Sequence, residues 1–180
     1  MQTIATLAEA HYRPGMLHKQ REEVDNAIEH LEKALELYEH ASDADIDEKL
    51  ATISDNLGML YVSRKEYEVA KKHYSSAYSF YENCIGREDM LTADCAYRLG
   101  KVLEELESDL AEEFYTESLR VHRLNMVEDD ERVGELLFCL GGISLAKGAG
   151  DDAVKHFEEV SITILIALSV LPQLLMFLSL

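Results

Sequence analysis

The chain has 180 residues and a formal net charge of −18, with 35 acidic against 17 basic side chains. This length allows one ordinary domain or a short repeat array, and 47% hydrophobic with 29% charged residues is a globular rather than a disordered composition. The excess of carboxylates excludes nucleic acid as a partner, because a phosphate backbone would be repelled, and it favours basic partners.

Apolar residues recur at three- and four-residue spacing through the first 160 positions, and no stretch alternates like a strand. The pattern predicts eight helices, at about 2–19, 22–41, 45–63, 66–84, 90–106, 108–124, 130–147 and 151–163. Ser63 and Glu66 have the spacing of a capping box at one of the turns. The fold class is therefore all-α.

An internal repeat organises these helices. Residues 15–38 laid over residues 58–81, at an offset of 43, are identical at nine of 24 positions. Unrelated sequences would share roughly one or two. Glycines continue the pattern at about the same interval: Gly15, Gly58, Gly100 and Gly141. The sequence thus contains four related copies.

Each glycine is followed by a small residue and then by a large apolar one. The small residues are Ala27, Ala70, Ala111 and Ala153, and the large ones are Leu31, Tyr74, Tyr115 and Phe157. Small side chains let two antiparallel helices approach closely while the large side chain fills the gap beside them. One helix pair cannot bury its apolar stripe alone, so consecutive pairs are expected to stack.

These marks resemble the tetratricopeptide repeat, whose pattern is L-G-x-x-Y followed by A-x-x-x-F. Leu57, Gly58, Tyr61, Ala70 and Tyr74 carry it most completely. The period of 41 to 43 is similar to the longer repeat of kinesin light chains. The resemblance implies a right-handed solenoid of about four antiparallel hairpins in residues 1–160, divided near 1–43, 44–86, 87–128 and 129–160.

The resemblance also implies a function, namely a non-catalytic adaptor that binds protein or peptide segments in a concave groove lined by the first helix of each pair. The implied groove residues are Tyr12, Met16, Thr52, Asp55, Asn56, Met59, Val62, Asp94, Tyr97, Arg98, Lys101, Glu104, Glu135 and Phe138. Aromatics and methionines beside a few polar groups suit peptide binding. Asn56 and Arg98 match two positions of the carboxylate clamp found in some of these domains. Asp94 stands where the clamp has a lysine, so no clamp is expected.

Catalytic and metal-binding patterns are missing from the sequence. It contains no glycine-rich phosphate loop, H-E-x-x-H or G-x-S-x-G motif. Glu36 with His40, and Asp152 with His156, have one-turn spacing, but two ligands without a third are usually an exposed helix pair. We therefore expect no enzyme, no metal site and no cofactor.

The last 21 residues, from Val160 to Leu180, carry no charge. As a helix they would extend about 32 Å, enough to cross a bilayer core. Residues 161–180 are therefore a hydrophobic tail with three open interpretations: a membrane anchor, an apolar cap over the array, or an aberrant chain end. An anchor would make the chain a tail-anchored receptor using the same groove.

Cysteine content and sorting signals bear on location. Cys84, Cys95 and Cys139 are too few and too scattered for a disulfide framework, which favours a reducing compartment. The first twenty residues do not have the pattern of a secretory signal. The expected location is the cytoplasm, with membrane association through residues 160–180 as the alternative.

Overall fold

The computed structural model describes residues 4–41, 46–125 and 131–162, and this part of the chain is helical without strands. The helices are α1 (Ile4–Gln20), α2 (Val24–Glu39), α3 (Ile46–Ser63), α4 (Tyr67–Cys84), α5 (Met90–Glu105), α6 (Ala111–Leu124) and α7 (Glu131–Ala146). A further helix occupies 150–162. All eight expected helices are confirmed, and their ends agree within three residues.

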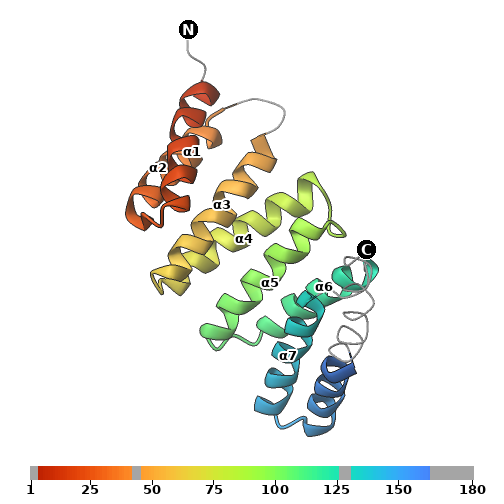
Figure 1. Ribbon diagram of the computed structural model, residues 1–180. Coiled ribbons are helices and arrows are strands. Elements are labelled where there is room, and N and C mark those ends of the chain that lie inside the picture. The colour runs from red at the N-terminus through yellow and green to blue at the C-terminus, as the bar shows by residue number, and fades with distance from the viewer. Residues whose placement is uncertain (1–3, 42–45, 126–130, 163–180) are drawn as a thin grey trace, which may run out of the picture. The chain divides into compact units, whose positions relative to one another are not determined.

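The chain forms two compact units, Met1–Ala111 and Glu112–Leu180. In the first unit α1 pairs with α2 and α3 with α4 as antiparallel hairpins, and α5 follows (Figure 1). The second unit holds α6, α7 and the helix at 150–162. The two helices predicted for the third hairpin therefore belong to different units, and the predicted repeat boundaries stay a prediction.

The repeat glycines bring helices into close contact, as predicted. A Cβ placed on Gly58 would lie 2.7 Å from Cδ1 of Tyr74, a ring that is 3% exposed. A Cβ on Gly15 would lie 2.8 Å from Cγ of Leu31, and one on Gly141 would lie 2.7 Å from Cε1 of Phe157. These partners are the large residues that follow Ala27, Ala70 and Ala153. The expected packing of glycine against the large residue is confirmed for these three copies.

The turns after α1, α3, α5 and α7 each contain one residue with a left-handed backbone. Its φ is 60° at Glu22, 60° at Lys65, 53° at Glu107 and 75° at Gly148. These positions follow the same spacing as the glycines. The capping box predicted at Ser63 is wrong, because α3 runs through Ser63, whose Oγ donates to the carbonyl oxygen of Leu60 at 2.6 Å. Because the Ser63 hydroxyl is bonded to a carbonyl oxygen within α3, it does not accept a hydrogen bond from the first N–H groups of α4.

The uncharged C-terminal run lies outside the described residues except for positions 160–162. Among the helices that the structure does describe, none combines the length and apolarity needed to cross a membrane. The three interpretations of the tail therefore stay predictions.

We predict that Gly58→Ala lowers the free energy of unfolding by about 1 to 2 kcal/mol. Overpacking against the buried Tyr74 ring costs about 1–3 kcal/mol, and alanine returns up to about 1 kcal/mol through its higher helix propensity. Chemical denaturation followed by circular dichroism measures the change.

The matched control is Gly142→Ala, because Gly142 lies in α7, is exposed, and has no atom within 4 Å of an added Cβ. This variant should be as stable as the wild type or more stable, by up to about 1 kcal/mol. Equal stability of Gly58→Ala and the wild type would contradict the packing account.

Candidate functional site

The candidate site lies in the first unit, on side chains from α1, α3 and α5. Helix α3 is the centre of this region, and every residue from Ile53 to Gly58 is buried. The run includes Asp55 and Asn56, whose polar atoms need partners because burial removes their water. Those partners come from α5 and α1.

Asp55 forms a two-point ion pair with Arg98 of α5. Nε of Arg98 donates to Oδ1 of Asp55 at 2.9 Å, and Nη2 donates to Oδ2 at 3.0 Å. The side chains are only 12% and 25% exposed for Asp55 and Arg98. A planar guanidinium matches both carboxylate oxygens, so the pair fixes the orientation of both groups.

Lys19 of α1 completes the arrangement from the other side. Its Nζ donates to Oδ1 of Asn56 and lies 3.5 Å from Sδ of Met59. Nδ2 of Asn56 in turn donates to the carbonyl oxygen of Thr52 at 2.7 Å. Lys19, Asp55, Asn56 and Arg98 thus link three helices, and we call them the ionic cluster.

Burial and mutual attraction compete within the ionic cluster. Burial raises the pKa of the Asp55 carboxyl, while Arg98 and Lys19 act to lower it and nearby Asp94 acts to raise it. Burial likewise lowers the pKa of the Lys19 ammonium, against the attraction of Asp55. For Arg98, burial acts to lower the pKa, but Asp55, together with Cys95 and Tyr74, raises it overall. Each charge in the cluster therefore depends on the others.

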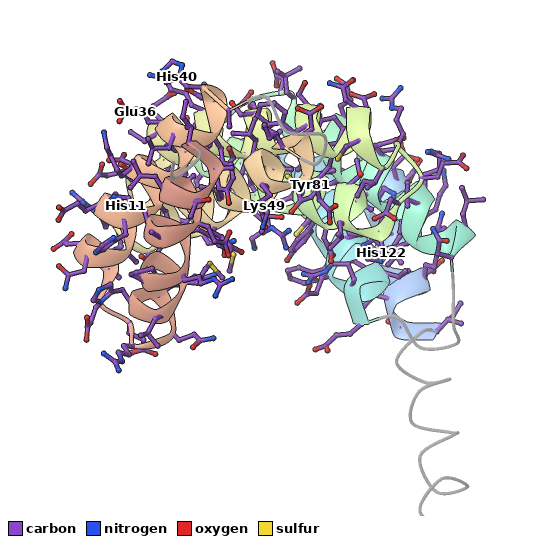
Figure 2. All side chains as sticks on the ribbon, turned by 90° about the horizontal axis from the view of Figure 1, so that it is seen from above. His11, Glu36, His40, Lys49, Tyr81 and His122 are labelled. Carbon is purple, nitrogen blue, oxygen red and sulfur yellow. The ribbon has the colours of Figure 1, made fainter. Side chains whose placement is uncertain are left out.

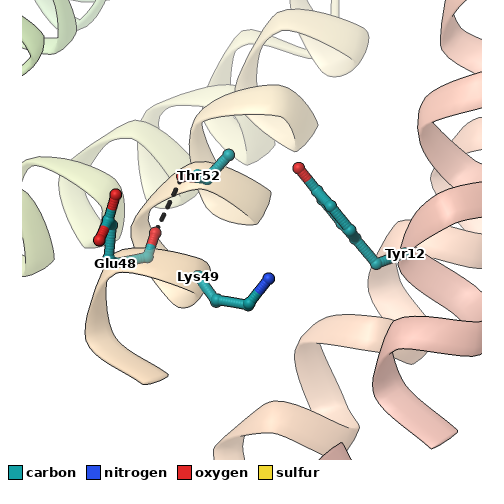
Figure 3. Close-up of a pocket in the computed structure, with 4 residues that line it drawn as sticks. All are labelled: Tyr12, Glu48, Lys49 and Thr52. Carbon is teal, nitrogen blue, oxygen red and sulfur yellow. Dashed lines mark hydrogen bonds between the residues drawn. The ribbon is translucent and has the colours of Figure 1, made fainter. Parts of the chain in front are cut away.

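A hollow of about 290 Å³ lies between α1 and α3, lined by Tyr12, Glu48, Lys49 and Thr52. Figure 3 shows Tyr12 of α1 facing Lys49 and Thr52 of α3, with Glu48 on the far side. Lys49 Nζ is 5.6 Å from the centre of the Tyr12 ring and 3.4 Å from Oε2 of Glu9. Thr52 Oγ1 donates to the carbonyl oxygen of Glu48 at 2.9 Å.

The structure brings part of the predicted groove set together. Asp55, Asn56, Met59 and Arg98 meet in or beside the ionic cluster, while Tyr12 and Thr52 line the hollow. The other predicted residues of the first unit lie on α1, α3 and α5 and are half-buried or exposed: Met16, Val62, Asp94, Tyr97, Lys101 and Glu104. A binding role for any of them stays a prediction.

Glu135 and Phe138 belong to α7 in the second unit. Glu135 accepts a hydrogen bond from Nη1 of Arg132 at 2.6 Å. Phe138 is 64% exposed and meets Phe157 edge-on, with ring centres 5.7 Å apart. Their role as groove residues also stays a prediction.

Lys19, Glu48 and Lys49 were not predicted. The repeat itself carried a signal for Lys19, because it stands 43 positions before Val62, which was in the predicted groove set. Glu48 and Lys49 gave no such signal. Both residues come before Thr52, the first predicted groove residue of α3. Only the structure shows that they line a hollow with Tyr12 of α1.

Histidines and carboxylates of the first hairpin line a second hollow of about 360 Å³, at His11, Glu29, His30, Glu32, Lys33 and Glu36. Nδ1 of His11 lies 3.3 Å from Nδ1 of His30. His11, Glu36 and His40 all project from the first hairpin in Figure 2. Within the described ranges, no three His, Cys, Asp or Glu side chains form a group that could hold a metal ion. That the chain lacks catalytic, metal and cofactor sites remains an expectation.

We predict that Arg98→Met lowers the free energy of unfolding by about 2 to 3 kcal/mol, because it leaves the Asp55 carboxylate buried without its partner. The double variant Asp55→Leu/Arg98→Met removes both charges and should lose less stability than Arg98→Met alone. Denaturation of both variants and the wild type measures this. A double variant less stable than Arg98→Met would contradict the interdependence of the two charges.

The tetratricopeptide repeat family model matches residues 6–82 and 48–123. Together these matches cover more than half of the 180 residues. No curated protein matched the chain in a sequence comparison.

Several solved structures are similar to this chain. BtubC (BKLC) from P. vanneervenii superposes with a TM-score of 0.76 at 21% identity, covering 91% of this chain and 65% of that one. The apo form of RapI gives 0.73 at 13% identity, covering 87% and 55%. A putative kinesin light chain from Podospora anserina gives 0.71 at 15% identity, covering 89% and 75%.

At these identities the likeness concerns the fold, and this chain spans less than two thirds of the length of BtubC and of RapI. The family match, the repeated helix pairs and the glycine contacts all agree. The chain therefore belongs to the tetratricopeptide repeat family.

Proposed function

We propose that the chain is a non-catalytic protein-interaction module that holds a peptide segment against α1, α3 and α5 of its first unit. The observation that carries this proposal is the ionic cluster. In it, hydrogen bonds and an ion pair join side chains of α1, α3 and α5, each the first helix of its repeat. A family of interaction scaffolds is consistent with this role. The interlocked side chains give the face a fixed shape, and a preorganised surface loses less entropy on binding.

Groups suited to a peptide surround the ionic cluster. Met59 is 40% exposed and offers an adaptable apolar contact. Tyr12 offers an aromatic ring at the hollow. Lys19 and Lys49 each carry three N–H donors, and donors of this kind can bind the carbonyl oxygens of a peptide main chain.

We predict that Met59→Ala and Tyr12→Ala each weaken peptide binding about five- to thirtyfold, the effect expected when a contact side chain of an interface is truncated. Selection from a displayed random-peptide library on the purified full chain supplies the ligand. Fluorescence anisotropy with the selected peptide then gives the affinities, and circular dichroism melting checks that each variant is folded.

The control is Lys33→Ala, because Lys33 lies on α2, which is not one of the three helices of the proposed face, in an exposed pair with Glu36. Its affinity should equal that of the wild type. A library that yields no binding peptide would overturn the proposal. So would a peptide that loses affinity with Lys33→Ala but with neither variant of the face.

A further inference from the structure

Asp55 departs from the pattern of the repeat. At the offsets of 43 and 42, its position corresponds to Tyr12 in the first copy and Tyr97 in the third. Two copies therefore place an aromatic side chain where the second copy places a carboxylate. That carboxylate is nearly buried, and burying a charge is costly unless it is paired.

The pairing of Asp55 does more than satisfy a buried group. A buried ion pair often adds little stability compared with apolar side chains of similar size. The other two copies have a tyrosine at this position, which needs no ionic partner. We therefore look for the role of Asp55 in the negative charge that it adds to the face formed by α1, α3 and α5.

The charges at the centre of the face balance one another. Lys19 and Arg98 contribute two cations, and Asp55 and Asp94 contribute two carboxylates close enough to affect one another. Both oxygens of Asp55 are engaged by Arg98, so Nε and Nη2 of its guanidinium each already have a carboxylate partner. At the hollow, Nζ of Lys49 lies 3.4 Å from Oε2 of Glu9.

We propose that Asp55 is a built-in counter-anion that closes this face to acidic peptide segments, so that its partner is a segment of neutral to basic character. A ligand carboxylate would have to compete with Asp55 for Arg98, and like charges placed together penalise the wrong partner. The net charge of −18 acts in the same direction at long range. This inference rests on the proposed function and adds the charge of the partner.

The test compares two synthetic twelve-residue peptides, one repeating Gly-Ser-Glu and the other Gly-Ser-Lys, by titration calorimetry at low salt. The wild type should bind the lysine peptide more tightly than the glutamate peptide. Asp55→Asn keeps the side-chain shape but removes the charge. It should shift the ratio of the two affinities about tenfold toward the glutamate peptide.

Asp47→Asn is the matched control, because Asp47 is an exposed aspartate at the start of the same helix and the variant has the same net charge. Its ratio should stay within about twofold of the wild type. Lys19→Gln supplies a second test, because it removes a cation but none of the hydrogen bonds between Asp55 and Arg98. It leaves the carboxylates in excess and should shift the ratio the other way, toward the lysine peptide.

The inference is overturned if the wild type prefers the glutamate peptide, if Asp55→Asn shifts the ratio no more than Asp47→Asn, or if Lys19→Gln fails to move it. Should Asp55→Asn melt below the assay temperature, Lys19→Gln decides alone. Failure of the proposed function would look different, because no library peptide would then be selected while the response to the two charged peptides is still measured.

Discussion

The close approach of paired helices at the repeat glycines is the constraint on which the rest of this structure depends. With no side chain at Gly58, the ring of Tyr74 packs directly on the backbone of α3, and Gly15 and Leu31 do the same for the first pair. Such packing buries α3 almost completely through its middle. The polar residues that α3 carries there, Asp55 and Asn56, must then find protein partners instead of water.

The ionic cluster follows from that burial. Its members come from three helices. If one of these helices moved, the cluster residues on the other helices would lose a hydrogen-bond partner. Lys19 ties α1 to α3 through Asn56, and Arg98 ties α5 to α3 through Asp55. Polar groups that are fully paired in a region of low dielectric constant favour one arrangement over its competitors. The same contacts therefore shape the surface and define its charge.

The sequence was sufficient for the parts of the fold that repeat. Helix positions and the packing of Leu31, Tyr74 and Phe157 on glycines followed from spacing, because each copy confirms the others. The ion pair between Asp55 and Arg98 could not be predicted from the sequence, because it joins residues of different copies and depends on the angle between α3 and α5. The sequence predicts Arg98 as a groove residue, which stays a prediction, and the structure adds Asp55 of α3 as its main partner.

The hairpin turns have a consequence of their own. A left-handed backbone is natural for Gly148 but strained for Glu22, Lys65 and Glu107, which carry side chains. Because the left-handed backbone recurs at the same place in the turns after α1, α3, α5 and α7, with or without a side chain, it comes from the way consecutive helices are joined and not from the turn residue. Packing of α1 on α2 and of α3 on α4 therefore sets the bend between them, and the turn residue adapts its backbone to that bend.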